Sequence, residues 1–214
     1  MTQVSAQNLA FSFGTRPLFA DVSFALGAGE LLYVRGSNGA GKSTLLKVIA
    51  GLLPPTRGSI KLPDNNQAGA RCSYLSPEQN GLYLHLSAAT NLQFWTELSS
   101  DQDSPSQLWD SLKLWGLSNP VTASHLPVSK FSTGMKRRLA LARVFSCRTN
   151  LYLLDEPTFG LDQAGCALLR TELHKLKERG ACVIVVSHDP EFLGKLTNKT
   201  LALSVHCSSG EDSL

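Results

Sequence analysis

The sequence predicts an α/β fold in which strands alternate with helices. A short apolar run at 31–34 leads into a glycine-rich turn at 36–43 and then into an apolar helical segment that ends at Ala50-Gly51. Two later runs, 151–154 and 181–186, are almost wholly apolar, which is typical of strands buried on both faces of a parallel sheet. We therefore expect a parallel sheet whose first strand carries the glycine-rich turn.

A hairpin is expected before that turn. Residues 4–13 and 18–26 look like two strands joined by the turn 14–17, because apolar residues alternate with smaller or polar ones along the second run. Pro54-Pro55 prevents the first helix from resuming. The elements expected next are a strand at 58–62, a polar loop at 64–69 and a strand at 71–75.

Residues from about 80 to 130 are expected to form a helical insertion within a single domain spanning 1–214. Helical spacing runs over 82–98, a second helix is expected at 107–115, and no strand–helix alternation interrupts the stretch. Alternation then resumes. The later elements expected are a strand at 151–154, a helix at 163–179 with Asp162 as its N-cap, a strand at 181–186 and an edge strand at 201–205.

Composition places the chain among ordinary globular proteins. Its 214 residues are 43% hydrophobic and 17% charged, which suits a core that folds without disulfide staples. A net charge of +3 argues neither for nor against nucleic acid, and the five scattered cysteines are expected to be reduced. We find no signal peptide and no membrane span, so a membrane function would need a second chain.

The glycine-rich turn has the spacing of a phosphate-binding P-loop, G-x-x-x-x-G-K-S. Glycines let backbone N–H groups close around phosphate oxygens, and the helix that follows points its positive end at them. A lysine adds charge for the β- and γ-phosphates, and a serine hydroxyl serves Mg²⁺. The alternative is an ordinary glycine-rich turn, which the strand and helix on either side disfavour. The candidate nucleotide-binding residues are Gly36, Ser37, Asn38, Gly39, Ala40, Gly41, Lys42, Ser43 and Thr44.

Two carboxylates follow the buried strand 151–154. In P-loop enzymes a carboxylate at this place holds Mg²⁺, usually through water, and we assign this role to Asp155. Glu156 lies one residue further, at the sheet edge where ligands bind, and is placed to polarise an attacking water. The alternative is a pair of exposed acids at a strand end. The upstream P-loop favours the catalytic interpretation.

A second helix start is expected at Ser132, which is a good N-cap. The residues that follow have helical spacing, so this helix would present its positive end outward. Taken alone, the pattern is more typical of a capped surface helix with a basic face. The run Lys136-Arg137-Arg138 is interpreted as a solvated face rather than a nucleic-acid site.

Together these motifs resemble the ATP-binding cassette ATPases. Phe131-Ser132-Thr133-Gly134-Met135 stands where that family has L-S-G-G-Q, and Phe159-Gly160-Leu161-Asp162 stands where it has S-A-L-D. Gln79 opens the helical insertion, His188 ends the strand after the acidic pair, and Phe13 lies where an aromatic stacks on adenine. The resemblance implies the ABC ATPase fold, a P-loop NTPase core with an antiparallel β subdomain and a helical insertion.

The resemblance also implies roles and partners. Two copies would pair head to tail, so that Ser132 and Gly134 of one chain complete the ATP site of the other. Ser43, Gln79 and Asp155 would hold Mg²⁺, and Asp162 would bridge the dimer. Glu156 would polarise the water while His188 contacts the γ-phosphate. Thr133 and Met135 depart from the family pattern, and Phe13 replaces a tyrosine, which keeps stacking but loses a hydroxyl.

A single cassette without a span suggests the ATPase subunit of a membrane exporter, bound at the cytoplasmic face of the cell membrane to an integral-membrane subunit. The segment 126–143 and the strand end 152–157 resemble the haem exporter ATPase of bacterial cytochrome c maturation. The alternatives are the ATPase of a lipoprotein-release or multidrug exporter and a soluble cassette ATPase acting on ribosomes or DNA. A P-loop kinase would need neither the helix start at Ser132 nor His188.

Overall fold

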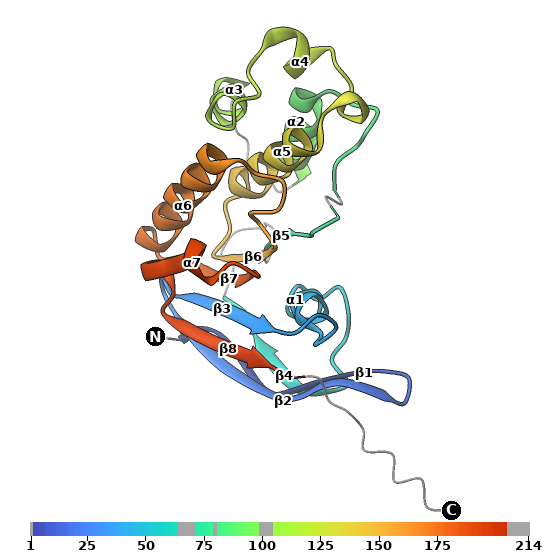
Figure 1. Ribbon diagram of the computed structural model, residues 1–214, viewed down its shortest axis with the longest axis vertical. Helices are drawn as coiled ribbons and strands as arrows, with labels where there is room; N and C mark the ends of the chain where they lie inside the picture. The colour runs from blue at the N-terminus through green and yellow to red at the C-terminus, as the bar shows by residue number, and fades with distance from the viewer. Residues whose placement is uncertain (1, 64–71, 79–80, 99–104, 205–214) are drawn as a thin grey trace, which may run out of the picture.

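The structure is a computed structural model that describes residues 2–63, 72–78, 81–98 and 105–204. It contains two sheets with helix α1 between them, and the other helices lie on the far side of the larger sheet (Figure 1). The smaller sheet is antiparallel, with strand order β2-β1-β4, and the larger is parallel, with order β5-β6-β7-β3-β8. The expected α/β class, the antiparallel subdomain and the helical insertion are confirmed.

The strands and helices have the following bounds. The strands are β1 (Thr2–Phe13), β2 (Arg16–Gly27), β3 (Leu31–Gly36), β4 (Arg57–Lys61), β5 (Ser73–Leu75), β6 (Leu151–Asp155), β7 (Cys182–Val186) and β8 (Lys199–Leu203). The α-helices are α1 (Lys42–Ile49), α2 (Ala88–Leu98), α3 (Pro105–Leu114), α4 (Pro120–Ser124), α5 (Thr133–Ser146), α6 (Gln163–Glu178) and α7 (Pro190–Leu193). The 3₁₀ turns are η1 (Val128–Lys130) and η2 (Gly194–Leu196). None of these helices is long and apolar enough to cross a membrane.

The central strands of the parallel sheet are buried on both faces, as their sequences predict. Leu31 and Tyr33 of β3 face the cluster beneath α5 and α6, whereas Leu32 and Val34 face the cluster around α1. The same alternation holds along β6 and β7, because successive side chains of a strand point to opposite faces. The P-loop strand is therefore fixed by apolar packing on both sides.

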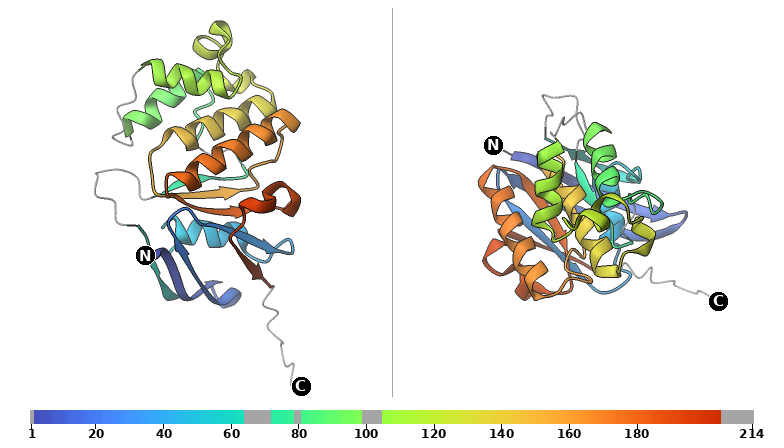
Figure 2. Two further views of the ribbon diagram at one scale, coloured as in Figure 1. Left: turned by 90° about the vertical axis from the view of Figure 1, so that its left-hand side faces the viewer. Right: turned by 90° about the horizontal axis from the view of Figure 1, so that it is seen from above.

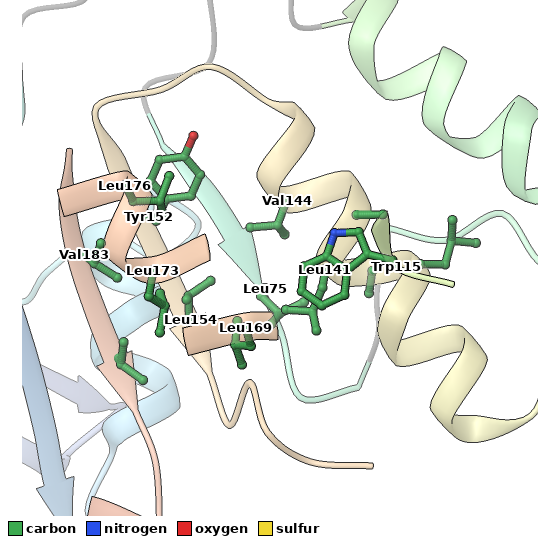
Figure 3. Packing of buried hydrophobic residues seen from close by; sticks show 14 of the residues in the cluster. Leu75, Trp115, Leu141, Val144, Tyr152, Leu154, Leu169, Leu173, Leu176 and Val183 are labelled. Atoms are coloured by element: carbon green, nitrogen blue, oxygen red, sulfur yellow. The ribbon is translucent and has the colours of Figure 1, made fainter. Parts of the chain in front are cut away.

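The cluster on the helical side joins the sheet to the inserted helices. Trp115, which follows α3, is 1% exposed and lies beside Leu141 of α5, while Leu154 of β6 packs near Leu169 and Leu173 of α6 (Figure 3). Figure 2 shows α5 and α6 on the same side of the sheet, with α2 and α3 beyond α5. This packing sets the position of α5 relative to the end of β6.

The helix expected over 82–98 begins only at Ala88. Asn91 is fully buried, and its side chain binds the backbone N–H of Tyr83 at 2.7 Å, the Tyr83 carbonyl at 3.0 Å and the Ser87 carbonyl at 2.9 Å. These bonds hold the preceding segment in a non-helical path, which is the usual competition between asparagine side chains and helical hydrogen bonds. Ser87 also accepts a bond from the backbone N–H of Thr90, as residues at helix starts do.

The last strand lies two residues earlier than expected, because β8 pairs in parallel with β3 from Leu32 to Gly36. It is an edge strand, as predicted. The starts of α5 and α6 agree with the sequence analysis, since Ser132 and Asp162 cap the helices that follow them. The predicted loop 64–69 lies outside the described residues.

Shortening a buried side chain of β6 is predicted to destabilise the whole chain. Leu154 is fully buried, so Leu154→Ala should lower the free energy of unfolding by about 2–5 kcal/mol through lost burial and the cavity left behind. Leu98 is 64% exposed, and Leu98→Ala should change the free energy of unfolding by no more than about 0.5 kcal/mol. Urea unfolding would measure both, and equal losses in the two variants would contradict the packing described.

Candidate functional site

The carboxyl ends of β3, β6 and β7 meet at one edge of the parallel sheet. Val34 is paired with Val186, and Val186 is paired with Asp155, so the three strand ends stand level. A cavity of about 380 Å³ opens at this edge. It is lined by Phe13, Leu18, Asn38, Gly39, Gly41, Lys42, Ser43, Thr44, Pro77, Asp155, Glu156, Val186 and His188.

The glycine-rich turn forms the floor of this cavity and leads into α1. Gly39 and Gly41 have φ of 80° and 90°, in the left-handed region that favours glycine. A Cβ on Gly41 would lie 2.8 Å from the Leu18 side chain, so the turn also needs glycine for close packing. The Lys42 ammonium donates hydrogen bonds to the carbonyls of Gly36 at 2.7 Å and Ser37 at 3.0 Å. Its positive charge is therefore held inside the turn.

The start of α1 is suited to bind an anion. Gly41 precedes the helix and has no side chain with which to cap it, and the first turn contains no acidic residue. The N–H groups of that turn and the helix dipole then favour negative charge at the cavity wall. Ser43 and Thr44 of this turn line the cavity, whereas Ala40 is fully buried and packs against the core around α1.

Asp155 lies at the end of β6 and is 1% exposed. Neither of its carboxylate oxygens has a hydrogen-bond partner of normal geometry in the part of the chain that the structure describes. Burial raises the pKa of the Asp155 carboxyl, and the charge of Glu156 adds to this, while the Ser43 hydroxyl and the charge of Arg137 oppose it. An unpaired buried carboxylate beside a hydroxyl fits Mg²⁺, which prefers oxygen ligands. Gln79, the third predicted ligand, lies outside the described residues.

Glu156 and His188 are in contact with one another in the lining of the cavity. The Glu156 Oε2 atom accepts a hydrogen bond from the backbone N–H of His188 at 3.2 Å. The His188 Nε2 atom lies 3.2 Å from the other carboxylate oxygen, Oε1, without the alignment of a hydrogen bond. The His188 side chain is 58% exposed, so it is accessible to a ligand. Both side chains line the same cavity as Lys42 and Ser43.

Ser132, Gly134 and Asp162 do not line the cavity. Ser132 is exposed at the start of α5, where its hydroxyl accepts a bond from the backbone N–H of Met135 at 3.2 Å. Asp162 caps α6 by accepting from the N–H of Gly165 at 2.9 Å, and its two oxygens bind Arg138 at 2.8 and 3.0 Å. The sequence-predicted residues therefore fall into two groups within one chain.

The expectation of a solvated basic face on α5 is wrong for Arg137, which is fully buried. Its guanidinium donates to backbone carbonyls at the ends of β5 and β6 rather than facing water. Burial lowers the pKa of Arg137 to about 10, with Asp155 and Glu156 opposing, so the group stays charged at neutral pH. A signal was present in the sequence, because position 137 shares helical spacing with Leu141 and Val144, which are both buried.

Comparison with known proteins agrees with this arrangement. The family model described as ABC transporter matches residues 19–159. The chain belongs to the ABC transporter family. An ABC transporter's ATP-binding subunit has the same fold, with a TM-score of 0.81 at 25% identity over 96% of this chain and 88% of that one. A dimeric ATP-binding cassette bound to ADP and Pi also shares the fold, with a TM-score of 0.79 at 23% identity over 96% and 97%.

Relatives of this ABC transporter subunit carry a more specific name. The cytochrome c biogenesis ATP-binding export protein CcmA of Chelativorans sp. is 39% identical over 88% of this chain and 92% of its own length. The protein of the same name from Rhizobium meliloti is 35% identical over 94% and 98%. The chain is thus the ATP-binding subunit of an ABC transporter and an ATPase of the translocase type.

Removing the unpaired charge at Asp155 is predicted to stabilise the nucleotide-free protein. Asp155→Asn should raise the free energy of unfolding at pH 7.5 by about 1–3 kcal/mol, because it replaces a buried anion that accepts no hydrogen bond of normal geometry by a neutral group. The pKa of Asp155 is raised in the folded chain, so the contribution of this carboxyl to stability falls as the pH rises above the ordinary aspartate value of about 3.9, and the advantage of Asp155→Asn over the wild type should be larger at pH 7.5 than at pH 5. Urea unfolding at pH 5 and 7.5 measures this, and a variant less stable than wild type at pH 7.5 would contradict it.

Proposed function

We propose that the chain hydrolyses ATP between two copies of itself and thereby drives export through a separate membrane subunit. The observation that carries this proposal is the division of the site into two groups. Lys42, Asp155, Glu156 and His188 surround one cavity, whereas the helix start at Ser132 lies outside it and is exposed. A second copy placed head to tail would bring its own helix start to this cavity.

Binding of ATP is assigned to the turn and the first turn of α1. The backbone N–H groups from Ser37 to Thr44 and the Lys42 ammonium surround the phosphates, and Lys42 exchanges its carbonyl partners for phosphate oxygens. Phe13 is 60% exposed at the cavity rim, which suits stacking on the adenine ring. Ser43, Asp155 and Gln79 would hold Mg²⁺, which when bound neutralises charge on the β- and γ-phosphates.

Hydrolysis is assigned to Glu156 and His188. Glu156 orients and polarises the attacking water, whose oxygen bonds to the γ-phosphorus as the bond to the β,γ-bridging oxygen breaks. The water's proton passes to the Glu156 carboxylate, and ADP and phosphate are released. His188 leaves its contact with Glu156 to donate a hydrogen bond to a γ-phosphate oxygen. Both side chains already line the same cavity in one chain.

The second copy supplies the helix start that binds the γ-phosphate from the other side of the cavity. Ser132 and Gly134 stand at the N-terminus of α5, a 14-residue helix whose dipole favours the γ-phosphate. Asp162 bridges the two copies, in exchange for its contact with Arg138. ATP then holds the two chains together, and the loss of the γ-phosphate contact on hydrolysis lets them separate.

A membrane partner is supported by an apolar surface on the inserted segment. Tyr83, Leu84, Leu86 and Phe94 are large hydrophobic residues with exposures of 44%, 47%, 37% and 37%. Tyr83 and Phe94 are in edge contact, with ring centroids 4.7 Å apart. Such an exposed apolar patch suits docking of another protein. We place the chain at the cytoplasmic face of the cell membrane, bound to an integral-membrane subunit through this patch.

The cargo we propose is haem for cytochrome c biogenesis. The support comes from relatives named as cytochrome c biogenesis export proteins, which align over most of this chain and of their own lengths. A lipoprotein-release or multidrug exporter would share the same ATP chemistry, because the cargo is selected by the membrane subunit. Only the cargo assignment, and not the ATPase mechanism, depends on these relatives.

Replacing Glu156 by glutamine is predicted to separate binding from hydrolysis. Glu156→Gln should keep ATP binding but lower turnover by about 10²–10⁴-fold, because the amide cannot accept the proton from water. The chain should then form a stable dimer with ATP and Mg²⁺ on size-exclusion chromatography, and Lys42→Ala should form none. Unimpaired hydrolysis by Glu156→Gln, or a monomer under these conditions, would refute the mechanism.

Complementation tests the cargo. A Rhizobium meliloti strain lacking its own CcmA and expressing this chain is expected to regain haem-stained c-type cytochromes, whereas the same strain expressing Glu156→Gln is not. The unmodified chain and the Glu156→Gln variant are compared at equal protein levels, as judged by immunoblot. Full ATPase activity in the membrane fraction without recovery of cytochrome c would assign the chain to an exporter with another cargo.

A further inference from the structure

Arg137 connects α5 to the turn that carries Glu156. It lies in the second turn of α5 and is fully buried. Its Nη1 atom donates to the carbonyl of Ser76 at 2.9 Å, and its Nη2 atom donates to the carbonyls of Asp155, at 2.9 Å, and Glu156. Its Nε atom donates to the carbonyl of Pro157 at 3.4 Å. One guanidinium therefore binds four carbonyls at the ends of β5 and β6.

The backbone of Glu156 needs such support. Its φ is 46°, in the left-handed region that glutamate rarely adopts, and strained residues of this kind persist only where their surroundings hold them. The Glu156 N–H donates to the carbonyl of Val186 at 2.9 Å, and the Glu156 carbonyl accepts from Phe159 at 3.1 Å and from Arg137. The direction of the Glu156 carboxylate follows from this backbone.

We propose that Arg137 is a positioning residue for ATP hydrolysis, which acts by holding the left-handed backbone of Glu156 and tying it to the start of α5. This inference rests on the proposed role of Glu156. Gly134 lies one helical turn before Arg137, so the segment that would touch the partner's ATP and the turn that carries Glu156 share one rigid connection. A change at Arg137 should therefore affect the chemical step more than nucleotide binding.

A purely structural role is the alternative, and α5 offers a matched control. Arg143 is also buried, at 8% exposure, and its Nη2 atom donates to the carbonyl of Tyr74 at 2.9 Å. Its guanidinium lies 4.9 Å from the centre of the Trp95 ring. Both arginines thus lie in α5, are buried and donate to a carbonyl in or next to β5. Of the two, Arg137 alone also binds the turn at Asp155–Pro157.

The test compares Arg137→Met and Arg137→Lys with Arg143→Met and Arg143→Lys in the full chain. Arg137→Met should lower kcat by about tenfold to a hundredfold, as small misplacements of catalytic groups do, with KM within about twofold of wild type. Arg137→Lys, which keeps the charge and some donors, should recover part of kcat. Both Arg143 variants should keep kcat within about twofold at matched thermal stability.

A second measurement asks whether the effect passes through Glu156. In the Glu156→Gln background, Arg137→Met should cause no further loss of residual hydrolysis, because a residue that acts through another is silent once that residue is changed. The inference is overturned if Arg137→Met lowers hydrolysis in the Glu156→Gln background by as large a factor as it does in the otherwise wild-type chain. It is also overturned if the Arg137 and Arg143 variants lose kcat equally. Where Arg137→Met does not fold, as judged by circular dichroism, the two lysine variants decide by the same criteria.

Failure of this inference is distinguishable from failure of the proposed function. If Glu156→Gln hydrolyses ATP normally, the assignment of Glu156 is wrong, and the role of Arg137 falls with it. If Glu156→Gln is inactive while Arg137→Met behaves as Arg143→Met does, the proposed function stands and only the positioning role is overturned. Binding of a fluorescent ATP analogue to each variant separates nucleotide affinity from the chemical step.

Discussion

Parallel pairing of β3, β7 and β6 is the constraint on which the rest of the site depends. Parallel strands end at the same edge of a sheet, and here Val34, Val186 and Asp155 stand in register. This pairing is sufficient to bring residues more than a hundred positions apart in the sequence to one cavity. The apolar clusters on both faces of the sheet keep this register, since a slip by one residue would turn every side chain to the opposite face.

Buried charge at this edge has a cost that the fold must offset. Asp155 accepts no hydrogen bond of normal geometry from the described residues and has the Ser43 hydroxyl nearby. Lys42 donates to carbonyls of its own turn. Arg137 supplies a third buried charge, in a cage of backbone carbonyls whose neighbours are the two carboxylates. These buried charges suit a charged ligand. Without a ligand, they make the folded chain less stable than it would be with apolar residues at this edge of the sheet.

The sequence predicted the fold class and the cavity because both rest on local patterns. The strand, glycine turn and helix around Lys42 and the apolar strand before Asp155 are recognisable from residue order alone. Arg137 was missed because charge in the run 136–138 outweighed the helical spacing that places this residue on the buried face. The start of α2 was also missed, since the bonds of Asn91 to Tyr83 depend on a chain path that hydrophobic spacing does not encode.

The bonds of Asn91 have a consequence for docking. They fix the backbone of Tyr83. Trp95, which lies in α2 with Asn91, donates to the Gly81 carbonyl at 2.6 Å, and its ring packs against Arg143 of α5. A partner that docks on Tyr83 meets a surface already ordered, so little conformational entropy is lost on contact. Through Trp95 and Arg143, the surface around Tyr83 is joined directly to α5.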